Sequence, residues 1–148
     1  MNALFTIGYE RATQDGLLAS LHQAGVGLLA DVRALPLSRR PGFSKSSLGA
    51  AVEQAGMVYR HFRHLGTPRE GREAARRGDL AGLRRSYEGQ LALPEALAQL
   101  AQLRALASER VTCLLCFCGE PAKCHRALLL AEGFAGFAVT HLHPAGAD

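Results

Sequence analysis

Residues 111–117, with the sequence Val-Thr-Cys-Leu-Leu-Cys-Phe, form a nearly continuous apolar run in the last third of the chain. Such runs are typical of central strands in parallel sheets, because helices bury these strands on both faces. A short loop ending near Pro121 follows, and apolar residues from about Cys124 to Glu132 then recur at helical spacing. The stretch therefore predicts the central strand of an α/β sheet, followed by a helix.

The same alternation extends outward from this run to both ends of the chain. Short apolar runs predict further strands at residues 3–7, 26–32, 57–62 and 137–142. Between them, helical periodicity predicts helices at residues 13–25, 44–56, 79–91 and 94–107. Thr13 and Asp79 are the expected N-caps, and Gly25 and Gly56 are the expected ends of their helices.

The resulting order of elements, βαβαβααβαβ, predicts one α/β domain that spans residues 1–148. Strands joined by helical crossovers form a mostly parallel sheet, here of about five strands, with helices on both faces in three layers. Residues 63–78 form one long connection that is charged and interrupted by glycines and a proline. They predict either a lid-like loop or a partly helical segment, and a loop of this length in a compact domain is usually functional.

Composition limits the classes to which the protein can belong. A chain of 148 residues, 48% of them hydrophobic, buries enough surface to fold without disulfides or a structural metal. No apolar run approaches the roughly 18 residues that a bilayer span requires, and the N-terminus lacks the pattern of a signal peptide. All four cysteines lie within residues 113–124, which is typical of reactive or metal-binding thiols in a reducing compartment. We therefore expect a cytoplasmic protein without a membrane partner.

Positive charge is concentrated in the middle of the chain. Residues 33–85 hold eleven arginines and one lysine against four acidic residues, an excess of eight charges in a chain whose net charge is +4. Arginine presents a planar, permanently charged set of donors that suits phosphates and other polyanions. A solvated arginine-rich surface would give the same total but explains the clustering less easily. The clustering indicates a phosphate-bearing ligand or a nucleic acid as partner, and the pattern indicates no particular oligomeric state.

Chemistry in a parallel sheet collects beyond the carboxyl ends of its strands. The residues that follow the expected strands, and should therefore lie at one edge, include Tyr9, Asp31, Arg33, His64 and Glu120. Asp31 and Arg33 occupy alternate positions on one side, where they either pair with each other or bind a ligand together. Ser38 and Arg39 follow in a loop beside an aromatic residue. This loop suits phosphate contact with base stacking, or it is simply a solvated basic loop.

Cys124, His125 and Arg126 stand where the last predicted helix begins. A cysteine in the first turn of a helix has its thiolate stabilised by free amide groups and by the helix dipole, and Arg126 would add to this effect. Cys124 is therefore the leading candidate for a reactive thiol, and His125 is a candidate general base or hydrogen-bond donor. The same amide groups also bind anions, so Cys124 could equally flank a bound phosphate without reacting.

Several familiar chemistries fit the chain poorly. Cysteine-based phosphatase loops carry an arginine six positions after the nucleophile, whereas that position after Cys124 is Leu130. Cys113 and Cys116 have the spacing of a zinc-binding pair, but residues three apart in a strand point to opposite faces, so no metal site is predicted. The chain also lacks a glycine-rich phosphate loop and a dinucleotide fingerprint. No cofactor is therefore predicted, and NAD and ATP are not supported.

Short motifs in a fixed order extend over nearly the whole chain: Thr6-Ile7-Gly8-Tyr9, Asp31-Val32-Arg33, Pro36, Ser38, Arg39, Gly42-Phe43-Ser44, Tyr59, Leu65-Gly66, Tyr87, Leu115-Cys116, Pro121 and Cys124-His125-Arg126. Together they resemble the bacterial "domain of unknown function 488" family. The resemblance implies a compact α/β domain and carries no established reaction. Many relatives have Cys-x-Glu where this chain has Cys116-Phe117-Cys118, so a thiol replaces the usual acid, and Glu120 is the nearest carboxylate that could compensate.

These observations support three hypotheses of function. The first is an enzyme that acts on a nucleotide or nucleic acid, with Cys124 as nucleophile or thiolate. The second is a non-catalytic nucleic-acid or nucleotide-binding module that uses residues 33–85, and the third is a thiol redox or metal-binding module at the four cysteines. For the first, the candidate catalytic residues are Cys124, His125, Asp31 and His64, and the candidate substrate-binding or anion-binding residues are Tyr9, Arg33, Ser38, Arg39, Glu120 and Arg126.

Overall fold

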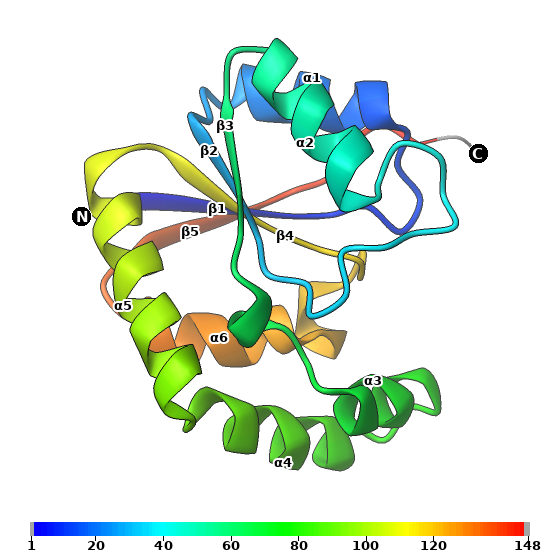
Figure 1. The fold of residues 1–148 in the computed structure, drawn as a ribbon, viewed down its shortest axis with the longest axis vertical. Helices are drawn as coiled ribbons and strands as arrows, with labels where there is room; N and C mark the ends of the chain where they lie inside the picture. Colours follow the sequence, from blue (N-terminus) through cyan, green and yellow to red (C-terminus); the bar gives the residue numbers. More distant parts are fainter. Residues whose placement is uncertain (1, 147–148) are drawn as a thin grey trace.

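Five parallel strands run through the centre of the molecule, and helices pack on both faces of the sheet (Figure 1). The computed structural model describes residues 2–146. The strands are β1 (Ala3–Gly8), β2 (Leu28–Asp31), β3 (Val58–His61), β4 (Thr112–Cys116) and β5 (Ala138–Leu142). Across the sheet they follow the order β3-β2-β4-β1-β5, and every neighbouring pair is parallel. The predicted three-layer α/β fold with a five-stranded sheet is confirmed.

The apolar run at residues 111–117 supplies β4, the middle strand of the sheet, with β2 on one side and β1 on the other. All residues of β4 are buried. Because successive side chains of a strand point to opposite faces, Cys113 and Leu115 join the core on one face and Leu114 joins the core on the other. A strand covered on both faces needs apolar side chains at every position, which is why this run lacks the polar alternation of a half-exposed strand.

The helices divide between the two faces (Figure 1). On one face, α1 (Gln14–Gln23) and α2 (Lys45–Gln54) bury Leu17, Leu21, Leu48 and Val52 against the sheet. On the other face, α4 (Leu80–Leu91), α5 (Pro94–Glu109) and α6 (His125–Gly133) pack around a second core that includes Tyr87, Leu103 and Leu129. Burying one such leucine stabilises a fold by about 1.5–3 kcal/mol, so the two cores hold the sheet between them.

The helix ends follow the predicted capping chemistry. The Thr13 hydroxyl accepts a hydrogen bond from the amide of Gly16 at 3.0 Å, and the Asp79 carboxylate accepts one from the amide of Gly82 at 2.8 Å. Gly25 follows α1 with a φ of 72°, a left-handed conformation that favours glycine. Ser44 precedes α2 without capping it through its side chain, and its hydroxyl instead accepts a hydrogen bond from the amide of Ser38. Ser44 therefore ties down the loop that precedes its helix.

Residues 63–78 contain a helix that the sequence did not resolve. A 3₁₀ turn (Arg63–Leu65) is followed by α3 (Arg69–Arg76), so three helices rather than the expected two lie between β3 and β4. The structure thus contains the partly helical segment that was one of the two expected alternatives, and α3 adds one helix to the expected order βαβαβααβαβ. In α3 only the small residues Gly71 and Ala74 are buried, Gly71 against Thr67 and Ser86. A helix that packs through such small residues lacks the apolar periodicity by which helices are recognised.

None of the helices within residues 2–146 is long and apolar enough to cross a membrane.

Candidate anion-binding and thiolate site

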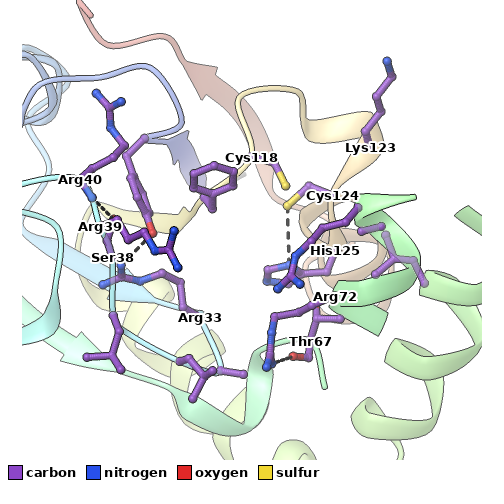
Figure 2. A pocket seen from close by; sticks show the side chains of 18 residues that line it. Arg33, Ser38, Arg39, Arg40, Thr67, Arg72, Cys118, Lys123, Cys124 and His125 are labelled. Atoms are coloured by element: carbon purple, nitrogen blue, oxygen red, sulfur yellow. Dashed lines mark hydrogen bonds between the residues drawn. The ribbon is translucent and has the colours of Figure 1, made fainter. Parts of the chain in front are cut away.

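A cleft with a volume of about 560 Å³ lies beyond the carboxyl ends of the strands (Figure 2). One wall is the loop after β2, which contributes Arg33, Ser38, Arg39 and Arg40, together with Tyr9 from the segment after β1. The opposite wall consists of Phe117 and Cys118 after β4, the residues from Lys123 to His125 at the start of α6, and one side of α3. The cleft therefore occupies the position at which the topology predicts a binding site.

The cleft is lined by six cationic side chains, and no carboxylate is found among its lining residues within 2–146. The cations are Arg33, Arg39, Arg40, Arg72, Arg76 and Lys123. Lys123 lies 3.4 Å from the exposed carboxylate of Glu120, whereas Arg39, Arg40, Arg72 and Arg76 have no ion-pair partner in the part of the chain that the structure describes. Burial and the neighbouring charges of Arg76 and Arg69 lower the pKa of Arg72. Like charges gathered around an open cavity favour an anionic ligand.

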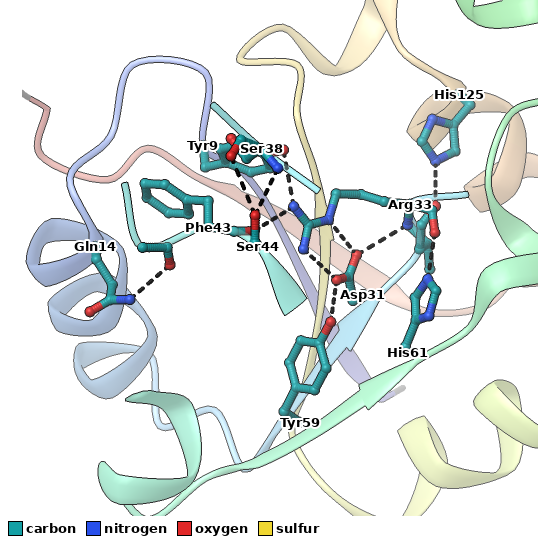
Figure 3. A network of polar contacts seen from close by, with 12 residues as sticks. Tyr9, Gln14, Asp31, Arg33, Ser38, Phe43, Ser44, Tyr59, His61 and His125 are labelled. Atoms are coloured by element: carbon teal, nitrogen blue, oxygen red, sulfur yellow. Dashed lines mark hydrogen bonds and ion pairs between the residues drawn. The ribbon is translucent and has the colours of Figure 1, made fainter. Parts of the chain in front are cut away.

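Four side-chain hydrogen bonds hold the guanidinium of Arg33 in place (Figure 3). Its Nε donates to Asp31 Oδ1 at 2.8 Å, and its Nη2 donates to Asp31 Oδ2 at 2.6 Å. Its Nη1 donates to the Phe43 carbonyl at 2.7 Å and to the Tyr9 hydroxyl at 3.1 Å. Burial alone would lower the pKa of Arg33, but the bonds to Asp31 outweigh burial and raise it. Arg33 is therefore a rigid, permanently charged group.

Asp31 lies behind Arg33 and does not line the cleft. Its carboxylate is 0% exposed and accepts from the amide and guanidinium of Arg33 and from the hydroxyl of Tyr59. Burial, followed by the charge of Asp31, raises the pKa of Tyr59 above its ordinary value. Of the two alternatives that the sequence left open for Asp31 and Arg33, the structure contains the mutual ion pair. Asp31 thus orients Arg33, and its carboxylate oxygens are engaged by Arg33 and Tyr59 rather than facing the cavity.

The rings of Tyr9 and Phe117 form an apolar part of the cleft lining. Tyr9 stacks on Phe43 with ring centroids 4.7 Å apart, and Phe117 meets the Tyr9 ring edge-on at 5.4 Å. The Arg33 guanidinium lies 5.2 Å from the centroid of the Tyr9 ring. Phe117 remains 48% exposed and Leu37 remains 72% exposed. The cleft therefore combines guanidinium groups with flat, accessible apolar surface.

Three of the four thiols converge at the other wall. The Sγ atoms of Cys116 and Cys124 are 3.1 Å apart, and Cys118 lines the cleft beside Cys124 (Figure 2). Hydrogen bonds from Cys116 and then Cys118 lower the pKa of Cys124 well below its ordinary value, and these outweigh the opposing effect of burial. Burial first, and then donation to neighbouring thiols, raises the pKa of Cys116. A hydrogen bond with Cys116 lowers the pKa of Cys118, but donation to Cys124 and burial outweigh it, giving about 12. Of these three thiols, Cys124 is the one whose pKa the cluster lowers.

His125 is oriented by the backbone. Its Nε2 lies 3.1 Å from the Val32 carbonyl, and its Nδ1 lies 3.6 Å from Cys124 Sγ. A carbonyl oxygen can only accept, so Nε2 carries a proton and Nδ1 faces the sulfur. Cys124 itself precedes α6 as its N-cap in extended conformation, so it does not lie within the first helical turn as expected. The hydrogen-bonded thiols and His125 therefore account for its thiolate character.

Arg126 is buried and does not line the cleft. It is 1% exposed; its Nη1 donates to the Thr6 hydroxyl at 2.9 Å, and its Nη2 donates to the Cys118 carbonyl. A Cβ atom at Gly8 would lie only 1.8 Å from that same carbonyl oxygen, so the loop carrying Cys118 crosses directly over the end of β1. Arg126 and Gly8 together set the position of this loop. The structure thus places Arg126, an expected anion-binding residue, outside the lining of the cleft and in contact with the loop that carries Cys118.

The sequence-predicted residues fall into two groups. The structure brings Tyr9, Arg33, Ser38, Arg39, Cys124 and His125 together around the cleft, and it places Asp31, His64, Glu120 and Arg126 outside its lining. His64 lies in the 3₁₀ turn, where its amide donates to Gln99 and its carbonyl accepts from Gln90. Glu120 is exposed and lines a second cavity of about 320 Å³ beside Gly119.

The candidate list missed four cations of the cleft: Arg40, Arg72, Arg76 and Lys123. Arg72 and Arg76 are four residues apart and therefore share one face of α3. This four-residue spacing is visible in the sequence, but it indicates a shared face only if residues 69–76 are known to be helical.

Within residues 2–146, no group of three or more histidine, cysteine or acidic side chains is arranged to hold a metal ion.

Comparison with curated proteins and with solved structures found no match to this chain. Comparison with family models found one: the model described as "Domain of unknown function DUF488" matches residues 13–132. This match covers most of the chain, including the loop after β2, α3 and the Cys124-His125-Arg126 motif, and the chain therefore belongs to the DUF488 family.

Proposed function

We propose that the protein is an enzyme that acts on a phosphate-bearing substrate, a nucleotide or nucleic acid, with Cys124 as its nucleophile. The observation that carries the proposal is the position of the Cys124 thiolate at the wall of a cleft whose lining has six cations and no carboxylate within residues 2–146. A low-pKa thiol combined with an anion-binding cavity is typical of functional sites.

The mixture of charge and flat apolar surface supports a nucleotide rather than a simple anion. Arg33 and Arg39 on one wall lie across the cavity from Arg72 on the other, so a phosphate group between the walls can be contacted from two sides (Figure 2). Phe117 offers a half-exposed ring on which a base can stack. Phosphate contacts would supply affinity, and stacking would supply orientation.

Cys124 and His125 supply the chemistry in this proposal. The Cys124 thiolate bonds to an electrophilic carbon of the substrate, and the bond from this carbon to its leaving group breaks. Water then bonds to the same carbon, the C–S bond breaks, and the thiolate is restored. The bond from Nε2 to the Val32 carbonyl holds His125 Nδ1 toward Cys124 Sγ, and when both ring nitrogens carry a proton, Nδ1 donates to the thiolate and stabilises it before attack. No arginine stands six positions after Cys124, where cysteine-based phosphatases carry one. We therefore assign the phosphate to binding and an electrophilic carbon of the substrate to attack.

Ligand protection of Cys124 tests the proposal directly. The rate at which iodoacetamide alkylates Cys124 is measured alone and with inorganic phosphate, mixed mononucleotides or a short single-stranded oligonucleotide, at low and high salt. We expect several-fold protection that weakens as salt rises, because phosphate contacts release counterions. Absence of protection by every probe, with an ordinary Cys124 pKa, would refute the proposal.

A non-catalytic binding module is separated from an enzyme by Cys124→Ser. If a protecting ligand binds this variant and the wild-type protein equally, and the wild-type protein neither turns the ligand over nor forms an adduct with it, the cleft is a binding site only.

A further inference from the structure

The thiol cluster has the geometry of a pair that can form a disulfide. Cys116 is the last residue of β4, and Cys124 immediately precedes α6. Their Sγ atoms are 3.1 Å apart, and a disulfide requires about 2.05 Å, so an approach of about 1 Å closes the bond. Arg126 holds the connection between them at Cys118, whereas residues 119–123 include the exposed Gly119 and Lys123, so this part of the connection can absorb such a movement.

The two thiols differ in access from the cleft. Cys124 is 4% exposed and lines the cleft, whereas Cys116 is 1% exposed and lies outside the lining. A small oxidant in the cleft therefore meets Cys124 first and has Cys116 immediately behind it. A reactive thiolate with an adjacent resolving thiol is the arrangement through which a cysteine passes from sulfenic acid to a disulfide.

We propose that Cys124 and Cys116 are a redox-active pair, in which a hydroperoxide oxidises Cys124 and Cys116 resolves the product to an intramolecular disulfide. In the first step Cys124 Sγ bonds to one peroxide oxygen, the O–O bond breaks, and the other oxygen leaves as water or alcohol after taking a proton. In the second step Cys116 Sγ bonds to Cys124 Sγ, the S–O bond breaks, and hydroxide leaves as water with the proton of the Cys116 thiol. Two thiols thus supply the two electrons that reduce the peroxide.

The other two cysteines are poorer partners for Cys124. Cys113 belongs to the core on the α1 and α2 side of the sheet, where Leu115 accompanies it. Cys118 lines the cleft and also interacts with Cys124, but the sulfur contact of 3.1 Å is between Cys124 and Cys116. The pairing rests on this geometry alone. Its consequence, loss of the nucleophile while the disulfide persists, rests on the proposed function.

Thiol counting on the full chain tests the pairing. Reduced protein is treated with a small excess of hydrogen peroxide, denatured in N-ethylmaleimide and weighed by mass spectrometry. Reduced protein should carry four labels, one on each cysteine, and oxidised protein should carry two. Trypsin cuts after Lys123 and Arg126, so the disulfide should join peptide 111–123 to peptide 124–126. Dithiothreitol should restore all four labels.

Matched serine variants identify the partner. Cys116→Ser should lose the disulfide and retain a sulfenic acid at Cys124 that dimedone traps, whereas Cys113→Ser and Cys118→Ser should still form it. Melting curves confirm that each variant is folded. Four labels after peroxide treatment, a disulfide that survives in Cys116→Ser, or a covalent dimer would overturn the proposal. None of these readouts depends on a substrate, so failure here leaves the proposed function untouched.

Discussion

The hydrogen bond from Cys116 to Cys124 carries a quantitative prediction. Cys116→Ala removes a donor that holds Cys124 as a thiolate, and it leaves the charged groups of the cleft in place. A hydrogen bond to a charged group contributes about 1.5–3 kcal/mol. Because one pKa unit corresponds to about 1.36 kcal/mol, the pKa of Cys124 should rise by about one to two units in this variant.

The pH dependence of alkylation measures this shift. The rate of iodoacetamide modification of peptide 124–126 is followed by mass spectrometry across the pH range, and its midpoint reports the pKa of Cys124. Cys116→Ser keeps a hydroxyl donor at the same position and should restore part of the lowered pKa. Cys113→Ala is the matched control, because this thiol is equally buried in β4 but belongs to the core on the opposite side from Leu114.

The reasoning is refuted if Cys116→Ala leaves the pKa of Cys124 unchanged, or if Cys113→Ala raises it equally. Equal effects would mean that Cys124 owes its thiolate character to the general environment of the sheet end.

Three further predictions follow from charge, titration and packing. Arg76→Ala should weaken the binding of a protecting anionic ligand and reduce the slope of log affinity against log salt concentration by about one. Arg77→Ala, which lies outside the cleft lining, should change neither quantity, and equal losses in the two variants would show that α3 is not part of the site. Folding lowers the pKa of Cys124, so its thiolate stabilises the fold above the unfolded pKa of about 8.5, and this contribution falls as the pH falls toward the folded pKa. Urea titrations should therefore show the stability advantage of wild type over Cys124→Ala growing with pH up to about 8.5, and a constant difference would contradict the lowered pKa. Gly8→Ala should destabilise the protein by about 1–3 kcal/mol or more, because the new Cβ would lie 1.8 Å from the Cys118 carbonyl oxygen. Gly27→Ala is the control, because its Cβ would have its nearest neighbour 3.7 Å away, and a thermal melt should show that only the first variant loses stability.

The strands and most helices were predictable because their signals are local. The apolar run around β4, the caps at Thr13 and Asp79 and the positive-φ stop at Gly25 each depend on a few neighbouring residues. Local patterns were also enough to place Cys124 and Arg33 near one edge, since parallel topology brings strand ends together. They failed for α3, whose buried face consists of small residues.

The composition of the site was decided by the tertiary structure. From sequence, Asp31 and Arg126 looked like ligand-binding or catalytic residues. In the folded molecule Asp31 pairs with its near neighbour Arg33 and accepts from the distant Tyr59, and Arg126 donates to the distant Thr6. Which polar groups remain available to a ligand is a property of the packed molecule, because a buried charge must be satisfied by partners that are distant in the chain.

The sequence by itself determined the alternation of strands and helices, the excess of arginine and the motif that holds Cys124. Only the tertiary structure placed Arg72 and Arg76 opposite the loop after β2, and Cys116 against Cys124. The physical reason is range, because propensity and periodicity act over a few residues. The charge of the cleft arises between segments that are far apart in the chain and meet only in the folded molecule. The contact between Cys116 and Cys124 depends on how the connection from β4 to α6 folds back.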